Sequence, residues 1–180
     1  MKIDSLDIPG TFEISTSIFE DSRGNFEKIY SEETYREAGL AFAVKQANIS
    51  RNLKKATVRG IHFQSVPFME SKIVTCLSGE VFDVMVDLRP LSKTFGIWQS
   101  VILKACSNGV FIPSGVAHGF QTLSDNCVIH YLHSENYDPS SSRGLKYNDA
   151  DVAVKWPMDI SEISKNDLML PSLAELRGQL

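Results

Sequence analysis

Four side chains that can move protons lie on strand-like segments in the middle of the chain: His62, Lys72, His118 and Tyr131. Side chains alternate between the two faces of a strand, and each of the four shares a face with mostly apolar neighbours. If these faces point inward, the four groups meet inside a barrel. A histidine base, a lysine beside a carbonyl oxygen and a tyrosine acid can together move a proton at a carbon next to a ketone. The pattern therefore favours inversion at such a carbon.

Each of these residues also has a purely structural interpretation. A strand histidine is commonly packed in the core, and a strand tyrosine often buries its ring with the hydroxyl at the rim. Lys72 fits that interpretation least, because burying an unpaired ammonium group is unfavourable. Further along, Asp167 lies three residues after Ser164, where an acid commonly caps the start of a helix.

A metal site is the main chemical alternative, because neutral imidazoles bind several transition metals. The four histidines are His62, His118, His130 and His133, and no two of them form an HxH pair. His130 and His133 are an odd number of positions apart, so a regular strand places them on opposite faces. We therefore expect neither a metal nor another cofactor.

Length and composition predict one ordinary globular domain over residues 1–180. Eighteen basic and 22 acidic residues give a net charge of −4, which disfavours a nucleic-acid-binding surface. The three cysteines show no disulfide or zinc spacing, which is typical of a reducing compartment. The charged N-terminal segment is unlike a signal peptide, and no stretch reaches the roughly 20 apolar residues of a membrane span. We expect a cytoplasmic protein that does not contact membranes.

Short alternating segments dominate residues 57–134 and predict an all-β fold. Strands are predicted at 57–64, 71–89, 98–105, 109–124 and 127–134, with a hairpin at Gly79 and a tight turn at 113–115. Helices are predicted after Ser31, with Gly39 as the stop, and after the caps Ser164 and Ser172. Many strands with few helices indicate a jelly-roll barrel, a double-stranded β-helix with a mouth for a ligand.

Nine stretches give the chain a more specific character. They are "DSRGNF" (21–26), "QANIS" (46–50), "VRGIHFQ" (58–64), "SKIV" (71–74), "GEVFDVMVDLR" (79–89), "IPSGVAHGF" (112–120), "YLHSENYDP" (131–139), "YND" (147–149) and "WP" (156–157). In this order they resemble the dTDP-4-dehydrorhamnose 3,5-epimerase family over nearly the whole length. The resemblance implies a jelly-roll homodimer and a metal-free reaction on a nucleotide-linked 4-keto-6-deoxy sugar.

The resemblance also implies roles for individual residues. His62 matches the base, Asp167 the acid that orients it, Tyr131 the proton donor and Lys72 the group that stabilises the enolate. Positions that match substrate contacts, some supplied by the partner subunit, are Arg23, Gln46, Asn48, Arg59, His118 and Tyr137, the last stacking on the nucleotide base. Arg59 conflicts with strict alternation from His62, and a bulge at Gly60 would resolve this conflict.

Three positions depart from the family pattern. Lys28 and Ser142 stand where the family has substrate-contacting glutamates, and Asn166 stands where it has a lysine. These departures leave several activities open beside inversion at C3 and C5 of a dTDP sugar. They are a single-centre epimerase or a ketoisomerase acting on a differently linked sugar, for instance a CDP sugar, and a sugar-nucleotide-binding protein without activity.

Overall fold

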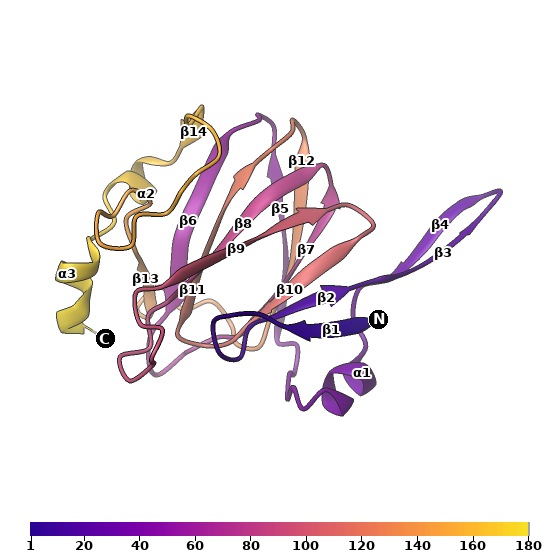
Figure 1. Cartoon of the computed structure of the whole chain (residues 1–180), viewed down its shortest axis with the longest axis horizontal. Coiled ribbons are helices and arrows are strands. Elements are labelled where there is room, and N and C mark those ends of the chain that lie inside the picture. The colour runs from indigo at the N-terminus through magenta and orange to yellow at the C-terminus, as the bar shows by residue number, and fades with distance from the viewer. Residues whose placement is uncertain (180) are drawn as a thin grey trace.

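The computed structural model describes residues 1–179, and these form two facing β-sheets with short helices around them (Figure 1). Leu180, the last residue of the expected domain, lies outside the described residues. The first sheet has the order β1 (Lys2–Ser5), β2 (Phe12–Ser15), β10 (Asn108–Ile112), β7 (Lys72–Ser78), β12 (Cys127–His133) and β5 (Gln46–Asn52). The second has the order β13 (Ser142–Gly144), β6 (Thr57–Gln64), β11 (Val116–Thr122), β8 (Glu80–Asp87) and β9 (Trp98–Lys104), with β14 (Glu162–Ile163) parallel to β6.

Alternating apolar residues explain how the two sheets pack. The main core contains inward-facing side chains of both sheets, among them Val74, Met85, Phe120 and Ile129, all essentially inaccessible to solvent. A second cluster lies on the other face of the second sheet, which the C-terminal segment covers. A third lies on the outer face of the first sheet, against Tyr35. The strands in the middle of the chain are therefore buried on both faces, and the jelly-roll prediction is confirmed.

The helices begin where the predicted caps stand. The helix α1 (Glu32–Glu37) is capped by Ser31, and Gly39 follows it with a φ of +76°. The helices α2 (Lys165–Leu168) and α3 (Leu173–Leu176) are capped by Ser164 and Ser172, and a short 3₁₀ turn, η1 (Arg177–Gln179), follows. Within the described part of the chain, no helix is long and apolar enough to cross a membrane.

The predicted hairpin at Gly79 is wrong. Gly79 separates β7 from β8, but these strands belong to different sheets and do not pair. The turn instead carries the chain from one sheet to the other, as does the confirmed turn at 113–115, where the Val116 N–H donates to the Pro113 carbonyl. Local turn chemistry predicts a reversal of the chain, but it does not say which sheet receives the next strand.

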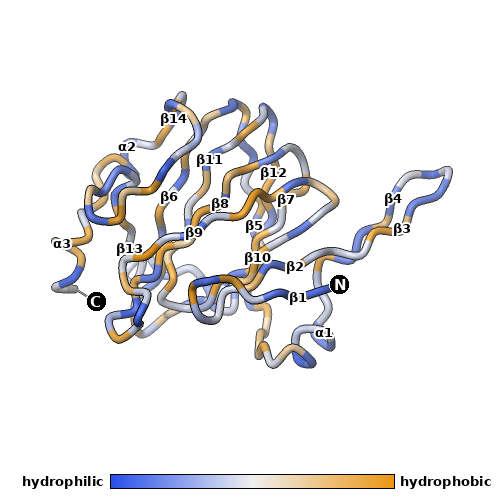
Figure 2. The backbone as a smooth tube through the Cα atoms, in the orientation of Figure 1, coloured by the Kyte–Doolittle hydropathy of each residue, from blue (hydrophilic) through white to orange (hydrophobic). Residues whose placement is uncertain are grey.

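A separate hairpin projects from the body of the molecule (Figure 1). It consists of β3 (Ser17–Asp21) and β4 (Gly24–Lys28), which pair with each other and, among the described strands, with no other. We call residues 17–28 the arm. Phe19 and Phe26 lie opposite each other on it and are 63% and 71% exposed. Figure 2 shows hydrophobic residues along its strands and a hydrophilic tip. Isolated two-stranded hairpins are marginally stable in water, and this one leaves two large apolar side chains exposed.

The strand β6 contains the irregularity that the position of Arg59 required. In the antiparallel pairing of β6 with β11, His62 lies opposite His118 and Arg59 lies opposite Phe120. Between these two pairs β11 spans two residues, whereas β6 spans three. Gly60 lies in the extra step with a φ of +104°. A Cβ there would lie 2.7 Å from the Cα of Gly119 and from the carbonyl oxygen of His118. Only glycine fits this position.

We predict that Gly60→Ala lowers the free energy of unfolding by about 2 kcal/mol or more, because a non-glycine residue is strained at this φ and its Cβ overlaps backbone atoms. Thermal unfolding should then occur roughly 4–8 °C lower. Gly178→Ala is the matched control, since a Cβ there meets nothing within 4 Å. Equal melting temperatures for the two variants would contradict the requirement for glycine.

Candidate active site

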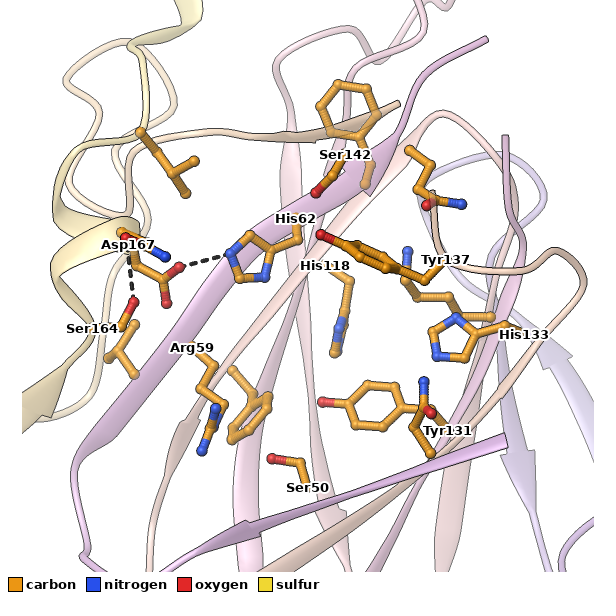
Figure 3. Close-up of a pocket in the computed structure, with 18 of the residues that line it drawn as sticks. Ser50, Arg59, His62, His118, Tyr131, His133, Tyr137, Ser142, Ser164 and Asp167 are labelled. Carbon is orange, nitrogen blue, oxygen red and sulfur yellow. Dashed lines mark hydrogen bonds and ion pairs between the residues drawn. The ribbon is translucent and has the colours of Figure 1, made fainter. Parts of the chain in front are cut away.

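A pocket of about 920 Å³ opens between the two sheets and contains the residues expected to do chemistry (Figure 3). The second sheet contributes His62 on β6 and His118 on β11, and the first contributes Lys72 on β7 and Tyr131 on β12. The other predicted residues that line it are Gln46, Asn48, Arg59, Tyr137, Ser142 and Asp167. This size suits a ligand as large as a nucleotide sugar.

His62 and Asp167 form a pair at one side of the pocket (Figure 3). The His62 Nε2 lies 2.7 Å from the Asp167 Oδ1, and the Gly60 N–H donates to the other carboxylate oxygen at 3.3 Å. Ser164 caps α2 by accepting from the Asp167 N–H, so the Asp167 side chain is free to face the histidine. The helix cap is therefore Ser164, as predicted, and the Asp167 carboxylate contacts His62 and the Gly60 N–H in addition to its place in the first turn of α2.

The charge of Asp167 suits the orientation of a histidine base. Burial raises the pKa of Asp167, but the hydrogen bond with His62 and the Gly60 N–H outweigh it and hold the pKa below its ordinary value. The carboxylate is thus ionised near neutral pH. Its side chain is 8% exposed, whereas that of His62 is 48% exposed and open to a ligand. A buried carboxylate that fixes an accessible imidazole is a typical arrangement for a general base.

Tyr131 projects from the opposite sheet, and its hydroxyl points toward the middle of the pocket (Figure 3). Burial, followed by the nearby charge of Asp83, raises the pKa of the Tyr131 phenol, while Arg59 lowers it in part. The phenol therefore keeps its proton near neutral pH. His118 lies between the two sheets with its ring edge-on to Tyr131, the centroids 5.8 Å apart.

Two carboxylates complete the site, and sequence reasoning missed both. Asp83 is fully buried and its Oδ2 lies 2.7 Å from the His118 Nε2. Glu70 contacts Lys72 at 2.5 Å and the His133 Nδ1 at 2.9 Å. Asp83 carried a signal in the sequence, as a lone acid between the inward-facing Val81 and Met85 of an apolar strand. Glu70 carried less, because it lies just before its strand begins.

The histidines do not gather into a metal-binding cluster. Three of them pair with three different carboxylates, namely His62 with Asp167, His118 with Asp83 and His133 with Glu70. Within residues 1–179 no three histidine, cysteine or acidic side chains are arranged to hold a metal ion.

Arg23 and Lys28 do not line the pocket of their own chain. Arg23 lies at the tip of the arm, 87% exposed, and pairs with Asp21 at 2.6 Å. Lys28 ends β4, in a regular register opposite Ser17. The neighbouring Glu27 accepts a hydrogen bond from Thr16, and no bulge shifts it into the place of Lys28. Ser142 and Asn166, the other two departures, do line the pocket.

Comparisons with known proteins agree with this geometry. The family model described as dTDP-4-dehydrorhamnose 3,5-epimerase matches residues 5–175. The dTDP-4-dehydrorhamnose 3,5-epimerase of Mycobacterium tuberculosis is 38% identical, over 99% of this chain and 90% of its own. The dTDP-4-dehydrorhamnose 3-epimerase of Streptomyces niveus is also 38% identical, over 98% and 86%.

A solved structure extends the comparison to a bound ligand. The Legionella pneumophila dTDP-6-deoxy-D-glucose-3,5-epimerase, in complex with dTDP-4-keto-L-rhamnose, superposes with a TM-score of 0.93. It is 34% identical, with 99% of this chain and 95% of that one covered. With the family model and the relatives above, this shows that the chain belongs to the dTDP-4-dehydrorhamnose 3,5-epimerase family.

Proposed function

We propose that the pocket binds a dTDP-linked 4-keto-6-deoxyhexose and inverts C3, C5 or both by removing and returning a proton. The observation that carries this proposal is the placement of His62 and Tyr131 on the two facing sheets, across one pocket. A sugar ring between them has a base on one face and an acid on the other. Removal of a proton from one face and its return to the other inverts the carbon.

The first half-reaction belongs to His62. The imidazole takes the proton from the carbon next to the ketone, and Asp167 orients the ring and stabilises the imidazolium that forms. The electron pair moves onto the ketone oxygen and makes an enolate. Lys72, whose ammonium group lines the same pocket, is placed to stabilise the negative oxygen.

The second half-reaction belongs to Tyr131. Its phenol gives a proton to the opposite face of the enolate carbon, and the ketone forms again. His118 packs edge-on against the Tyr131 ring and is itself fixed by its contact with Asp83. A protein that only bound the sugar nucleotide would not need a protonated acid on the face opposite a base.

The nucleotide is assigned to the outer part of the pocket. Tyr137 is 62% exposed at the rim, where its ring is available to stack on a base. Its backbone N–H donates to the side chain of Gln46, which fixes the loop. Arg59 is held by Asn52 and pairs with no carboxylate among the described residues, so it is available for the diphosphate.

The arm is proposed to complete the site of a second subunit in a homodimer. Its exposed phenylalanines and Arg23 lie outside the pocket of their own chain, and a self-paired hairpin gains little stability alone. Burial of Phe19 and Phe26 against a partner would remove this exposure and bring Arg23 and Lys28 to a nucleotide. Residues 1–180 would act as one domain of this dimer, and a cytoplasmic location stays a prediction.

The activity is tested by incubation in deuterium oxide with dTDP- and CDP-linked 4-keto-6-deoxyglucose, followed by mass and label position. We expect label at C3, C5 or both of the dTDP sugar. The number of labels gives the number of centres that lose a proton, and the configuration of the product gives the number that are inverted. His62→Ala should lose exchange by a factor of about 10²–10⁴ or more, because the base is gone. Near-normal exchange in that variant would contradict the mechanism, and no label on any substrate would favour simple binding.

Tyr131→Phe should separate the two half-reactions. His62 still removes the proton and solvent exchange persists, while inversion slows because the acid on the opposite face is gone. The measurement compares the rate of label uptake by returned substrate with the rate of epimer formation. Equal loss of both would mean that Tyr131 acts in binding or orientation.

Mixing two inactive variants tests the arm. His62→Ala subunits keep an intact arm, and Arg23→Ala subunits keep an intact pocket. After subunit exchange we expect about a quarter of wild-type activity, since half of the dimers are mixed and each mixed dimer has one complete site. Activity that never exceeds the sum of the separate variants would show that the arm serves its own chain, and full activity of Arg23→Ala alone would show that Arg23 binds nothing essential.

A further inference from the structure

Three charged or titratable side chains meet on the side of the pocket away from Asp167. We call Glu70, Lys72 and His133 the Glu70 cluster. Glu70 lies just before β7, Lys72 begins that strand, and His133 ends the neighbouring β12, directly opposite Lys72. The Lys72 ammonium lies 2.5 Å from the Glu70 Oε1, and the His133 Nδ1 lies 2.9 Å from the Oε2. Each carboxylate oxygen thus has its own partner.

Lys72 needs such a partner because it is buried. Its side chain is 7% exposed, and burial lowers its pKa, while Glu70 acts in the opposite direction. A neutral amine could not stabilise an enolate by charge. Among the described residues, Glu70 is the carboxylate in ion-pair contact with Lys72. The charged form of the lysine thus depends on one neighbouring side chain.

Glu70 is itself held in one charge state and one orientation. Burial raises its pKa, but the hydrogen bond with His133 and the charge of Lys72 bring the pKa to about 2. The carboxylate is therefore ionised near neutral pH. His133 also stacks on Tyr131, with ring centroids 5.7 Å apart and planes inclined by 16°. Glu70 thus contacts the lysine directly and the proposed proton donor through His133.

We infer that Glu70 is a positioning residue for the epimerisation, which keeps the Lys72 ammonium charged and directed into the pocket, while His133 fixes the Glu70 carboxylate. This inference rests on the proposed role of Lys72 as the group that stabilises the enolate. It adds Glu70 and His133 to that site. It also makes the protonation state of Lys72 depend on the other two members of the Glu70 cluster.

Loss of the Glu70 charge should shift the pH profile of kcat in one direction. Activity requires protonated Lys72, and activity that needs a protonated group is lost as pH rises through its pKa. The Glu70 charge raises the pKa of Lys72, so its removal should move the alkaline limb of kcat to lower pH. The other titratable or charged groups that line the pocket come from several elements. They are His133 and Tyr131 on β12, His118 on β11 with Asp83 behind it, Arg59 and His62 on β6 with Asp167 beyond, Arg143 on β13, Glu162 on β14, and Tyr137. These stay in place in Glu70→Gln.

The experiment measures kcat, KM and the pH profile of Glu70→Gln on the dTDP-linked 4-keto sugar. We expect kcat to fall roughly tenfold or more with little change in KM, and the alkaline limb to move down by about one pH unit or more. Glu135→Gln is the matched control, because Glu135 pairs with Lys45 at 2.6 Å outside the pocket and its loss should leave both unchanged. Glu70→Asp keeps the charge and should recover part of both effects.

Lys72→Met separates failure of this inference from failure of the proposed function. Near-normal kcat in Lys72→Met would overturn the role of the lysine and the inference with it. If Lys72→Met is inactive but Glu70→Gln has the kcat and the alkaline limb of the wild type, the Glu70 inference alone is overturned. Circular dichroism and dTDP binding report folding. If Glu70→Gln does not fold, Glu70→Asp takes its place, because the shorter carboxylate must weaken the contact with Lys72. A shift of the alkaline limb of its kcat profile to lower pH supports the inference. An unchanged kcat with an unchanged alkaline limb overturns it.

Discussion

Removal of water from groups that must carry charge is the constraint on which this pocket depends. Lys72, His118 and their carboxylate partners are almost fully buried between the two sheets, and an unpaired charge there is unfavourable. Three of the four side chains first singled out in the sequence each have a carboxylate partner: Asp167 for His62, Asp83 for His118 and Glu70 for Lys72. The three acids come from a short C-terminal helix, a central strand and the loop before β7. The fold must bring all three segments together before these three side chains have their partners.

The bulge in β6 determines which side chains of this strand reach the pocket. In a regular strand, Arg59 and His62 would face opposite sides of the sheet, because they are an odd number of residues apart. The extra residue at Gly60 brings both to the pocket and also sends the Gly60 N–H to Asp167. One irregularity thereby places Arg59, a cation suited to a diphosphate, on the same side as the proposed base and its proposed orienting acid. A bulge next to a site that redirects a side chain is a recurrent use of this device.

Alternation and capping rules predicted much of this structure, and the failures have physical causes. The strand over 57–64 and the caps Ser31, Ser164 and Ser172 are where the sequence placed them, because these signals are local. The hairpin at Gly79 was wrong, because the pairing of β7 depends on segments far along the chain. The pairs of Asp83 with His118 and of Glu70 with His133 were missed for the same reason, since the partners are 35 and 63 residues apart. The motifs placed Asp167 beside His62 only through the resemblance to a family.

The two sheets also differ in how they expose the two proposed proton carriers, and this difference fits the proposed order of proton transfer. A base must return its proton to solvent or product after each turnover, and the half-exposed His62 ring can do so. An acid must keep its proton until the enolate is formed, and the buried Tyr131, with its pKa raised by burial and by the charge of Asp83, is suited to that. The buried Asp83 acts on Tyr131 as well as on His118. Burial raises the pKa of Asp83 while His118 lowers it, and the ionised form of Asp83 opposes ionisation of the phenol. The same exclusion of water that makes Lys72 depend on Glu70 keeps Tyr131 protonated.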